Sequence, residues 1–243
     1  MDEKIKIIYE DNNLLVVDKP AGVVVFSEKS EKRGTDEEKT LIEILLEKYQ
    51  WLKEVGGPPR YGIVHRLDKY TSGILLVAKN KSSLEFLQKQ FKERLVEKKY
   101  LALVSGHLKK KEGLVDTFIG RSPKNRTRQR VYLPYEPGLN KKRRAVTFYK
   151  VLKRFKNYDL VEAKPKTGRK HEIRVHFAFL GAPIAGDEVY GFKNQPCPKG
   201  LKRQFLHACY LKIKTLDGEI KEFSSDLPKD LKEVLHNLAE IKN

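Results

Sequence analysis

Two short stretches combine side chains that carry chemistry in other proteins, and their spacing excludes the best-known use of each. His171 and His176 flank an acidic residue, but a zinc-protease helix needs two histidines four positions apart on one face. Here they are five apart, about 140° around a helix. Residues 65–68 (His-Arg-Leu-Asp) contain the residue types of a kinase catalytic loop in a different order, and no glycine-rich phosphate loop precedes them. Neither a metal site nor phosphoryl transfer is therefore expected.

Asp68 is the strongest catalytic candidate in the chain. It follows the two apolar residues Ile63 and Val64 and precedes a strand expected over residues 74–78. An isolated aspartate in such a turn ordinarily caps the turn, and this role is the alternative. Arg66 stands two residues before it in a strongly basic chain, and functional side chains often lie where a loop meets a buried strand. We therefore interpret Asp68 as a catalytic carboxylate.

The positive charge of the chain is concentrated in one region. The 243 residues include 50 Lys and Arg and 32 Asp and Glu, a formal net charge of +18. Residues 121–174 hold 18 basic and 4 acidic side chains, a local balance of +14. Within this region Arg126 and Arg128 alternate with polar residues. Such a segment predicts phosphate binding driven by counterion release, with a solvated surface loop as the alternative.

Six segments in a fixed order resemble the motif series of the RluA family of pseudouridine synthases. They are Lys19–Gly22, His65–Gly73, Lys99–Tyr100, Thr167–His176, Gly186–Gly191 and Leu206–Ala208. One such motif would be weak, but the ordered set extends over nearly the whole chain. The resemblance implies an α+β pseudouridine synthase catalytic fold. In that fold a central mixed, mainly antiparallel sheet is flanked by helices and loops, with an active-site cleft across the sheet. It also implies no metal and no organic cofactor.

The resemblance assigns roles to individual residues. By position, Asp68 is the essential carboxylate, Tyr100 is the ring residue beside the target base, and Arg174 is the basic partner of Asp68. On pattern alone, Arg174 would be interpreted as a surface helix residue and Tyr100 as a core or edge-strand aromatic. The residues expected to contact RNA are Arg66, Arg169, Lys170, His171, Arg126 and Arg128. The chain departs from the family at Glu172, where Gln is common, and the added charge is expected to alter phosphate contacts.

The implied reaction turns uridine into its C-glycoside isomer in structured RNA, either rRNA or tRNA. It breaks the N1–C1′ bond, rotates the uracil, joins C5 to C1′ and removes the C5 proton, without redox change. An ionised carboxylate can attack a carbon centre or stabilise positive character at C1′. The sequence leaves open whether Asp68 attacks C1′ or C6 or removes a sugar proton. The target uridine has to be flipped out of its stack, and Arg66 is expected to fill the space.

Two other classes of function are compatible with some of these features. A non-catalytic basic RNA-binding or ribosome-assembly protein would use residues 121–174 alone. A nuclease or glycosylase with one carboxylate would release cleaved strands or free uracil, neither of which an isomerase produces.

The elements that position these residues follow from hydrophobic periodicity. Residues 5–18 predict a hairpin of short strands, residues 27–39 a loop, and residues 100–104 a strand. Thr40 and Glu43 form a capping box for a helix that ends before residue 56.

Two further helices are expected, and strands outnumber helices. Ser82 and Glu85 predict a cap for a helix with an apolar stripe. That stripe consists of Leu84, Leu87, Phe91 and Leu95. A third helix is predicted over residues 170–180, ending at Gly181. With no repeated βαβ unit, this pattern favours an α+β architecture on a largely antiparallel sheet.

Composition bounds the remaining possibilities. No apolar run approaches the ~20 residues of a membrane span, and the N-terminus lacks the pattern of a secretion signal. Two cysteines make no disulfide framework, so a cytoplasmic location is expected. We expect residues 1–243 to form a single catalytic domain, without a separate N-terminal RNA-binding domain, and to act as a monomer.

Overall fold

The computed structural model describes residues 5–28 and 39–239, and the chain forms two compact units. The first unit consists of the chain up to Glu97 together with Ala208–Asp226, and the second of Lys98–His207 together with the chain from Leu227. No helix in the described ranges is long and apolar enough to cross a membrane. The loop predicted over residues 27–39 lies mostly outside the described residues. The single catalytic domain expected over residues 1–243 stays a prediction.

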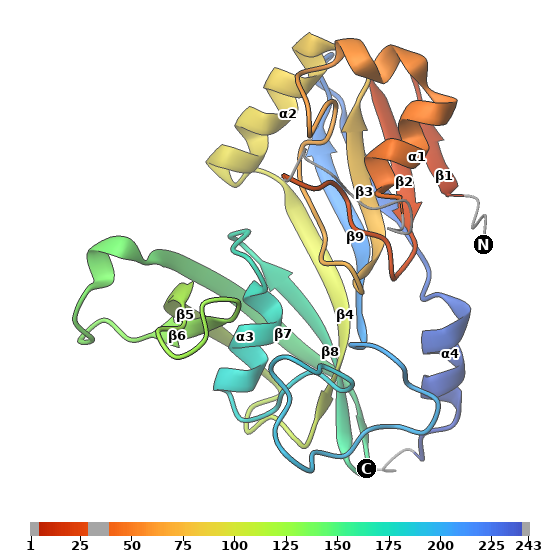
Figure 1. Cartoon of the computed structure of the whole chain (residues 1–243). Coiled ribbons are helices and arrows are strands. Elements are labelled where there is room, and N and C mark those ends of the chain that lie inside the picture. The colour runs from red at the N-terminus through yellow and green to blue at the C-terminus, as the bar shows by residue number, and fades with distance from the viewer. Residues whose placement is uncertain (1–4, 29–38, 240–243) are drawn as a thin grey trace. The chain divides into compact units, whose positions relative to one another are not determined.

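A mainly antiparallel sheet forms the first unit (Figure 1). Its strands are β1 (Lys6–Glu10), β2 (Leu14–Lys19), β3 (Ser72–Ala78), β10 (Ile220–Ser224) and, from Ala208 onward, β9 (Leu206–Lys214). β1 and β2 make the predicted hairpin, and β2 runs antiparallel to β3. Every residue of β3 is buried, as its apolar run predicted. The segment that carries Asp68 therefore leads directly into the core of this unit.

Two α-helices belong to the first unit, and the sequence located one start correctly. α1 (Leu41–Lys48) begins with the predicted capping box of Thr40 and Glu43 and is followed by a 3₁₀ helix, Gln50–Glu54. α2 (Lys81–Glu93) begins two residues earlier than predicted, because the side chain of Asn80, and not Ser82, accepts from the Ser83 N–H.

The apolar stripe of α2 is shorter than the sequence predicted. Leu84 and Leu87 are buried and Phe91 packs against the same cluster, but Leu95 is 66% exposed. Arg94 adopts a left-handed conformation at φ 62°, which ends the helix before Leu95.

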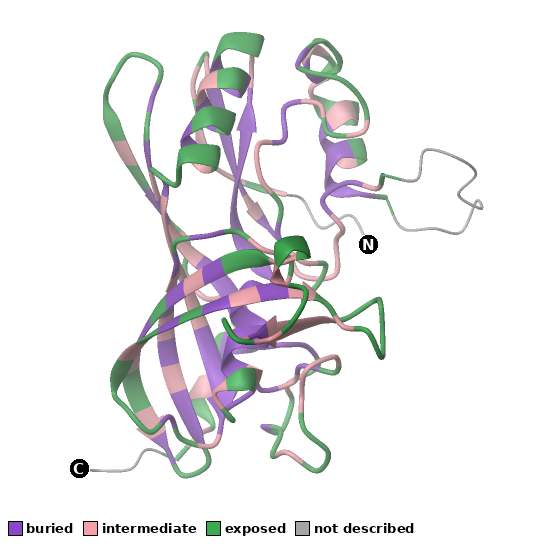
Figure 2. Ribbon diagram, turned by 90° about the vertical axis from the view of Figure 1, so that its left-hand side faces the viewer, coloured by how far each residue is buried: buried purple, intermediate pink, exposed green. Residues whose placement is uncertain are grey.

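A second antiparallel arrangement forms the second unit, in the order β4-β8-β7-β5-β6. Its strands are β4 (Glu97–Ser105), β5 (Glu112–Arg121), β6 (Gln129–Tyr132), β7 (Arg143–Phe155) and β8 (Tyr158–Pro165). Buried and exposed residues alternate along β5 and β7, as Figure 2 shows. β5 and β6 pair as a hairpin, and the turn between them carries Arg126 and Arg128.

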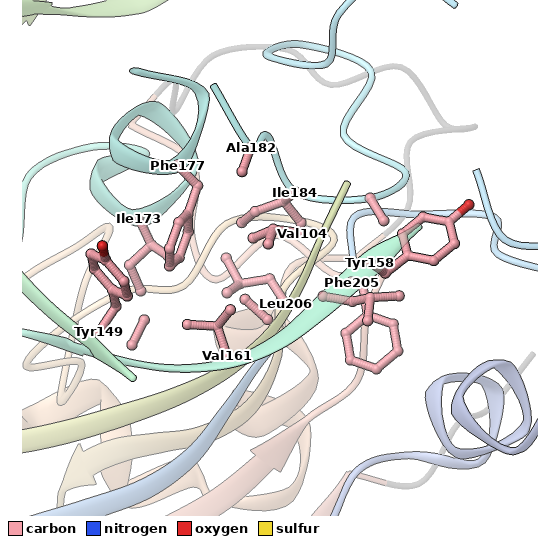
Figure 3. Packing of buried hydrophobic residues seen from close by; sticks show 14 of the residues in the cluster. Val104, Tyr149, Tyr158, Val161, Ile173, Phe177, Ala182, Ile184, Phe205 and Leu206 are labelled. Atoms are coloured by element: carbon pink, nitrogen blue, oxygen red, sulfur yellow. The ribbon is translucent and has the colours of Figure 1, made fainter. Parts of the chain in front are cut away.

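Two helices and a short 3₁₀ helix complete the second unit. They are α3 (Glu172–Phe179), α4 (Lys229–His236) and the 3₁₀ helix Leu139–Lys141. α3 lies within the predicted range 170–180, and Gly181 follows at φ 81°, a conformation that favours glycine. Ile173 and Phe177 of α3 pack among buried residues of the strands, including Tyr149 (Figure 3). This packing fixes α3 on the strands that surround it.

These elements confirm the expected fold class. Strands outnumber helices among the described residues, and most neighbouring strands are antiparallel. The antiparallel pairs are β1–β2, β2–β3, β9–β10, β4–β8, β7–β8, β5–β7 and β5–β6. The fold is α+β, as predicted.

Candidate active site

The Asp68 segment has no regular secondary structure but is anchored at both ends. Asp68 is half-buried, and its carbonyl accepts from the Thr71 N–H at 3.1 Å. On the other side, the His65 ring stacks on Phe91 and its Nε2 accepts from the Leu76 N–H of β3 at 3.0 Å. Because the acceptor nitrogen is Nε2, a neutral His65 carries its proton on Nδ1. His65 thus holds this segment against β3, a role that the sequence did not assign.

Lys19 is a fully buried cation that also holds the Asp68 segment in place through hydrogen bonds. Its Nζ donates to the carbonyls of Pro20 at 2.7 Å, Val23 at 2.9 Å and Lys69 at 3.0 Å. The Lys69 carbonyl also accepts from the Gly22 N–H. The turn that follows β2 is therefore tied to the residue adjoining Asp68. Carbonyl dipoles offset the cost of burying the ammonium group.

Arg66 is exposed and stacks on an aromatic ring. Its guanidinium lies 5.0 Å from the centroid of Phe26, and Arg60 lies at the same distance from that ring. A planar guanidinium on an aromatic face is held by cation–π attraction while its outer face remains able to stack. This arrangement is compatible with the base-replacing role expected for Arg66.

Arg174 lies in the first turns of α3 and is buried, which excludes the surface-helix alternative. Its Nε donates to Asp187 Oδ2 at 2.7 Å and its Nη2 to Asp187 Oδ1 at 2.9 Å. The two side chains are 6% and 0% exposed. Asp187 Oδ1 also accepts from the N–H groups of Val189 and Tyr190. A bidentate pair of this kind fixes the plane of the guanidinium.

Glu172 is buried, and its carboxylate accepts hydrogen bonds from two threonine hydroxyls and one backbone N–H. Oε1 accepts from the hydroxyls of Thr167 at 2.6 Å and Thr147 at 3.2 Å, and Oε2 accepts from the Arg169 N–H at 2.8 Å. Burial raises the pKa of Glu172, while these hydrogen bonds and the charge of Lys98 act in the opposite direction. The carboxylate thus shapes the turn over residues 167–171, and its expected effect on phosphate contacts stays a prediction.

The turn before α3 carries three residues expected to contact RNA. Lys170 is exposed, whereas Arg169 and His171 are half-buried. Arg169 Nε donates to the Arg144 carbonyl at 3.0 Å. His171 has a left-handed backbone at φ 59°, and its Nδ1 lies 2.8 Å from Tyr190 Oη. These residues therefore gather with Arg174 at the start of α3.

Tyr100 lies in β4, half-buried and opposite Ala163 of β8. Its ring packs at the margin of the buried cluster of the second unit. This contact matches the alternative of a core aromatic. The role beside the target base stays a prediction.

The basic turn, defined as residues 121–130, is held by hydrogen bonds of its own. The Ser122 N–H donates to the Arg128 carbonyl at 2.9 Å, and Asn125 Oδ1 accepts from the backbone and hydroxyl of Thr127. Arg126 and Arg128 are both exposed. The turn therefore presents its guanidinium groups from a defined backbone.

The predicted residues fall into two groups. Asp68 and Arg66 share one segment of the first unit, whereas Tyr100, Arg174 and the turn before α3 belong to the second. The pairing of Asp68 with Arg174 stays a prediction. Among the described residues, no cluster of three or more His, Cys, Asp or Glu is arranged to hold a metal ion.

His176 gives the second unit a predictable pH dependence. Thr147 donates its proton to Glu172, so it accepts from His176 Nδ1, and Thr117 donates to Nε2 at 3.1 Å. Burial lowers the pKa of His176 to about 4, against a weak opposing effect of Asp116. Since the unfolded chain binds this proton near pH 6.5, the contribution is complete above that pH and is lost as pH falls towards 4.

We expect the titration of His176 by itself to lower the free energy of unfolding by about 2 kcal/mol when the pH falls from 7 to 5. Glu172 acts in the opposite direction, because an acid whose pKa is raised by folding gains stability as pH falls. Urea unfolding at several pH values should therefore compare the wild type with His176→Gln, in which all other groups are retained. The variant should lose less stability on acidification. Parallel pH profiles would contradict this assignment.

The comparisons with known proteins agree with the motif series. The family described as RNA pseudouridylate synthase matches residues 13–179. An uncharacterized RNA pseudouridine synthase of Aquifex aeolicus is 44% identical over 81% of this chain and 59% of its own length. A ribosomal large subunit pseudouridine synthase D of Nitrosomonas europaea is 40% identical over 98% of this chain and 66% of its own. The chain thus spans less than two thirds of the length of these two relatives.

Solved structures show the same fold. Human RNA Pseudouridylate Synthase Domain Containing 1 has a TM-score of 0.77 and 30% identity, covering 98% of this chain and 89% of that one. Human RNA Pseudouridylate Synthase Domain Containing 4 has a TM-score of 0.74 and 28% identity, covering 98% and 94%. With its ordered motifs, its α+β fold and these matches, the chain belongs to the RluA family of pseudouridine synthases.

Proposed function

We propose that this chain is an RNA pseudouridine synthase that isomerises uridine in structured RNA, with Asp68 as its essential carboxylate. The observation that carries the proposal is the family match over residues 13–179, a range that contains Asp68, Tyr100 and Arg174. The name of the Nitrosomonas europaea relative refers to the large ribosomal subunit, which favours rRNA over tRNA as the first substrate to test. We further propose that it acts as a monomer in the cytoplasm.

In the proposed reaction each residue contributes a different physical effect. The ionised Asp68 carboxylate stabilises or attacks an electron-poor carbon of the target nucleotide. Arg174, always protonated, favours the ionised form of Asp68 in a site that excludes water. Tyr100 offers a flat apolar face to the uracil, and Arg66 stacks in the space that the flipped nucleotide leaves. No redox step is required, since the product is an isomer of the substrate.

Chemical mapping of pseudouridine tests the proposal directly. The purified chain is incubated with rRNA and tRNA, and total RNA from a deletion strain is compared with RNA from the complemented strain. At least one uridine should be converted by the chain and should be unmodified in the deletion strain. RNA binding without any converted uridine would favour the non-catalytic RNA-binding protein. Strand cleavage or free uracil would favour a nuclease or glycosylase.

The basic turn predicts a measurable salt dependence of RNA binding. If Arg126 and Arg128 each neutralise one phosphate, Arg126→Ala with Arg128→Ala should reduce the slope of log K against log salt by about 1.5. Lys109→Ala with Lys110→Ala is a matched control, because both lysines are exposed and precede the opposite end of β5. The control should leave the slope nearly unchanged. Equal slopes for the two double variants would contradict a specific role for the turn.

A further inference from the structure

Tyr190 lies where the basic turn, the turn before α3 and α3 itself meet within the second unit. It belongs to the turn that follows Asp187, and the aspartate fixes its backbone by accepting from the Tyr190 N–H at 3.0 Å. Its ring packs beside a small buried cluster that includes Val175 of α3 and Ile119 of β5. The side chain is half-buried, so its position is set by contacts on several sides.

The Tyr190 hydroxyl connects the basic turn to the start of α3. Oη accepts from the N–H of Gln129, the first residue of β6 and part of the basic turn, at 2.9 Å. The same oxygen lies 2.8 Å from His171 Nδ1. Because Oη already accepts from Gln129, its own proton can be donated to Nδ1 of a neutral His171, whose ring proton is then on Nε2. The Tyr190 hydroxyl oxygen therefore links the basic turn to the turn before α3, and both segments are expected to contact RNA.

The Tyr190 ring has a second contact that does not involve the hydroxyl. The Arg174 guanidinium carbon lies 5.2 Å from the ring centroid, and Asp187 holds the same guanidinium through its bidentate pair. The His171 ring also meets Tyr190 edge-on, with centroids 5.6 Å apart. A guanidinium between a carboxylate and an aromatic face has little freedom to rotate. The ring and the hydroxyl of one residue thus act on different groups.

We propose that Tyr190 is a positioning residue with two separable effects. Its hydroxyl holds the basic turn in place for RNA binding, and its ring orients Arg174 for turnover. This inference rests on the proposed function, because it concerns the RNA and the reaction named there. Tyr190 does not itself take part in bond breaking.

Two substitutions at Tyr190 separate these effects. Tyr190→Phe removes only the hydroxyl, and the loss of hydrogen bonds should raise KM for RNA about three- to tenfold while kcat stays within about twofold. Tyr190→Leu removes the ring as well and should lower kcat about three- to thirtyfold in addition. Tyr9→Phe is the matched control, since its hydroxyl bonds Asp11 in the first unit. That control should change neither constant.

A double-mutant cycle tests whether the hydroxyl acts through the basic turn. In the background of Arg126→Ala with Arg128→Ala, Tyr190→Phe should have almost no further effect on KM, because the charges that it positions are gone. A purely structural role of the hydroxyl would give the same increase in both backgrounds. An equal increase, or a loss of kcat in Tyr190→Phe with KM unchanged, would overturn the inference.

The wild type separates this test from that of the proposed function. If the wild type forms no pseudouridine in any RNA, the proposed function fails, and Kd for RNA still reports whether Tyr190→Phe weakens binding through the basic turn. If the wild type is active and Tyr190→Phe matches it in KM, only the inference fails. Urea midpoints are measured for each variant. Should Tyr190→Leu not fold, Tyr190→Phe and the cycle still decide the effect of the hydroxyl.

Discussion

Replacing Asp68 with Asn is expected to abolish pseudouridine formation, lowering kcat by about four orders of magnitude or more, while RNA affinity stays within about twofold. The amide keeps the shape of the carboxylate but is neither charged nor nucleophilic. Asp68 is only half-buried, and its carbonyl bond to Thr71 is made by the backbone, so the fold should tolerate the change. Single-turnover pseudouridine formation and equilibrium RNA binding measure the two effects separately.

The matched control is Glu54→Gln, an exposed acid changed to its amide in the same unit. It should retain full activity. If Asp68→Asn also retains activity, Asp68 is a turn-capping residue and not the essential carboxylate. If it loses RNA binding and activity together, the carboxylate acts on substrate binding, which contradicts the proposed role in the chemical step.

The sequence predicted a helix end correctly where that end depends only on residues close to it in the chain. The capping box of α1 is an example, because Thr40 and Glu43 bond each other across one turn. The start of α2 was predicted two residues late, at Ser82. Asn80 caps the helix, and its side-chain amide also donates to Asn13 Oδ1 at 2.8 Å. That second contact joins residues 67 positions apart, which periodicity does not report.

In the candidate site, too, the sequence indicated residue types but not the contacts between residues distant in the chain. The resemblance singled out Asp68 and Arg174 as candidates, because motifs record residue types in order. The partner of Arg174 within its unit, Asp187, is 13 residues away and is brought to it by the turn after α3. Likewise, Tyr190 meets the basic turn across 61 residues. The segment Gly186–Gly191 was part of the motif series, but nothing local to it indicates which side chains it holds.

Replacing Arg174 is expected to reduce both stability and activity, and its partner distinguishes the two effects. Arg174→Met leaves the Asp187 carboxylate, which is 0% exposed, without its bidentate partner, so the unfolding free energy should fall by about 3–5 kcal/mol. If Arg174 also stabilises the ionised Asp68, turnover should fall about 10²- to 10³-fold in protein that remains folded. Urea unfolding and single-turnover assays below the unfolding transition measure these losses.

Arg174→Met combined with Asp187→Asn separates stability from catalysis. The amide removes the buried charge but retains an acceptor for the Val189 and Tyr190 N–H groups, so most of the lost stability should return. Activity should not return, because the guanidinium is still missing. Recovery of turnover together with stability would mean that Arg174 acts only by holding Asp187 and its turn. A stable but inactive double variant would instead assign the guanidinium to the reaction itself.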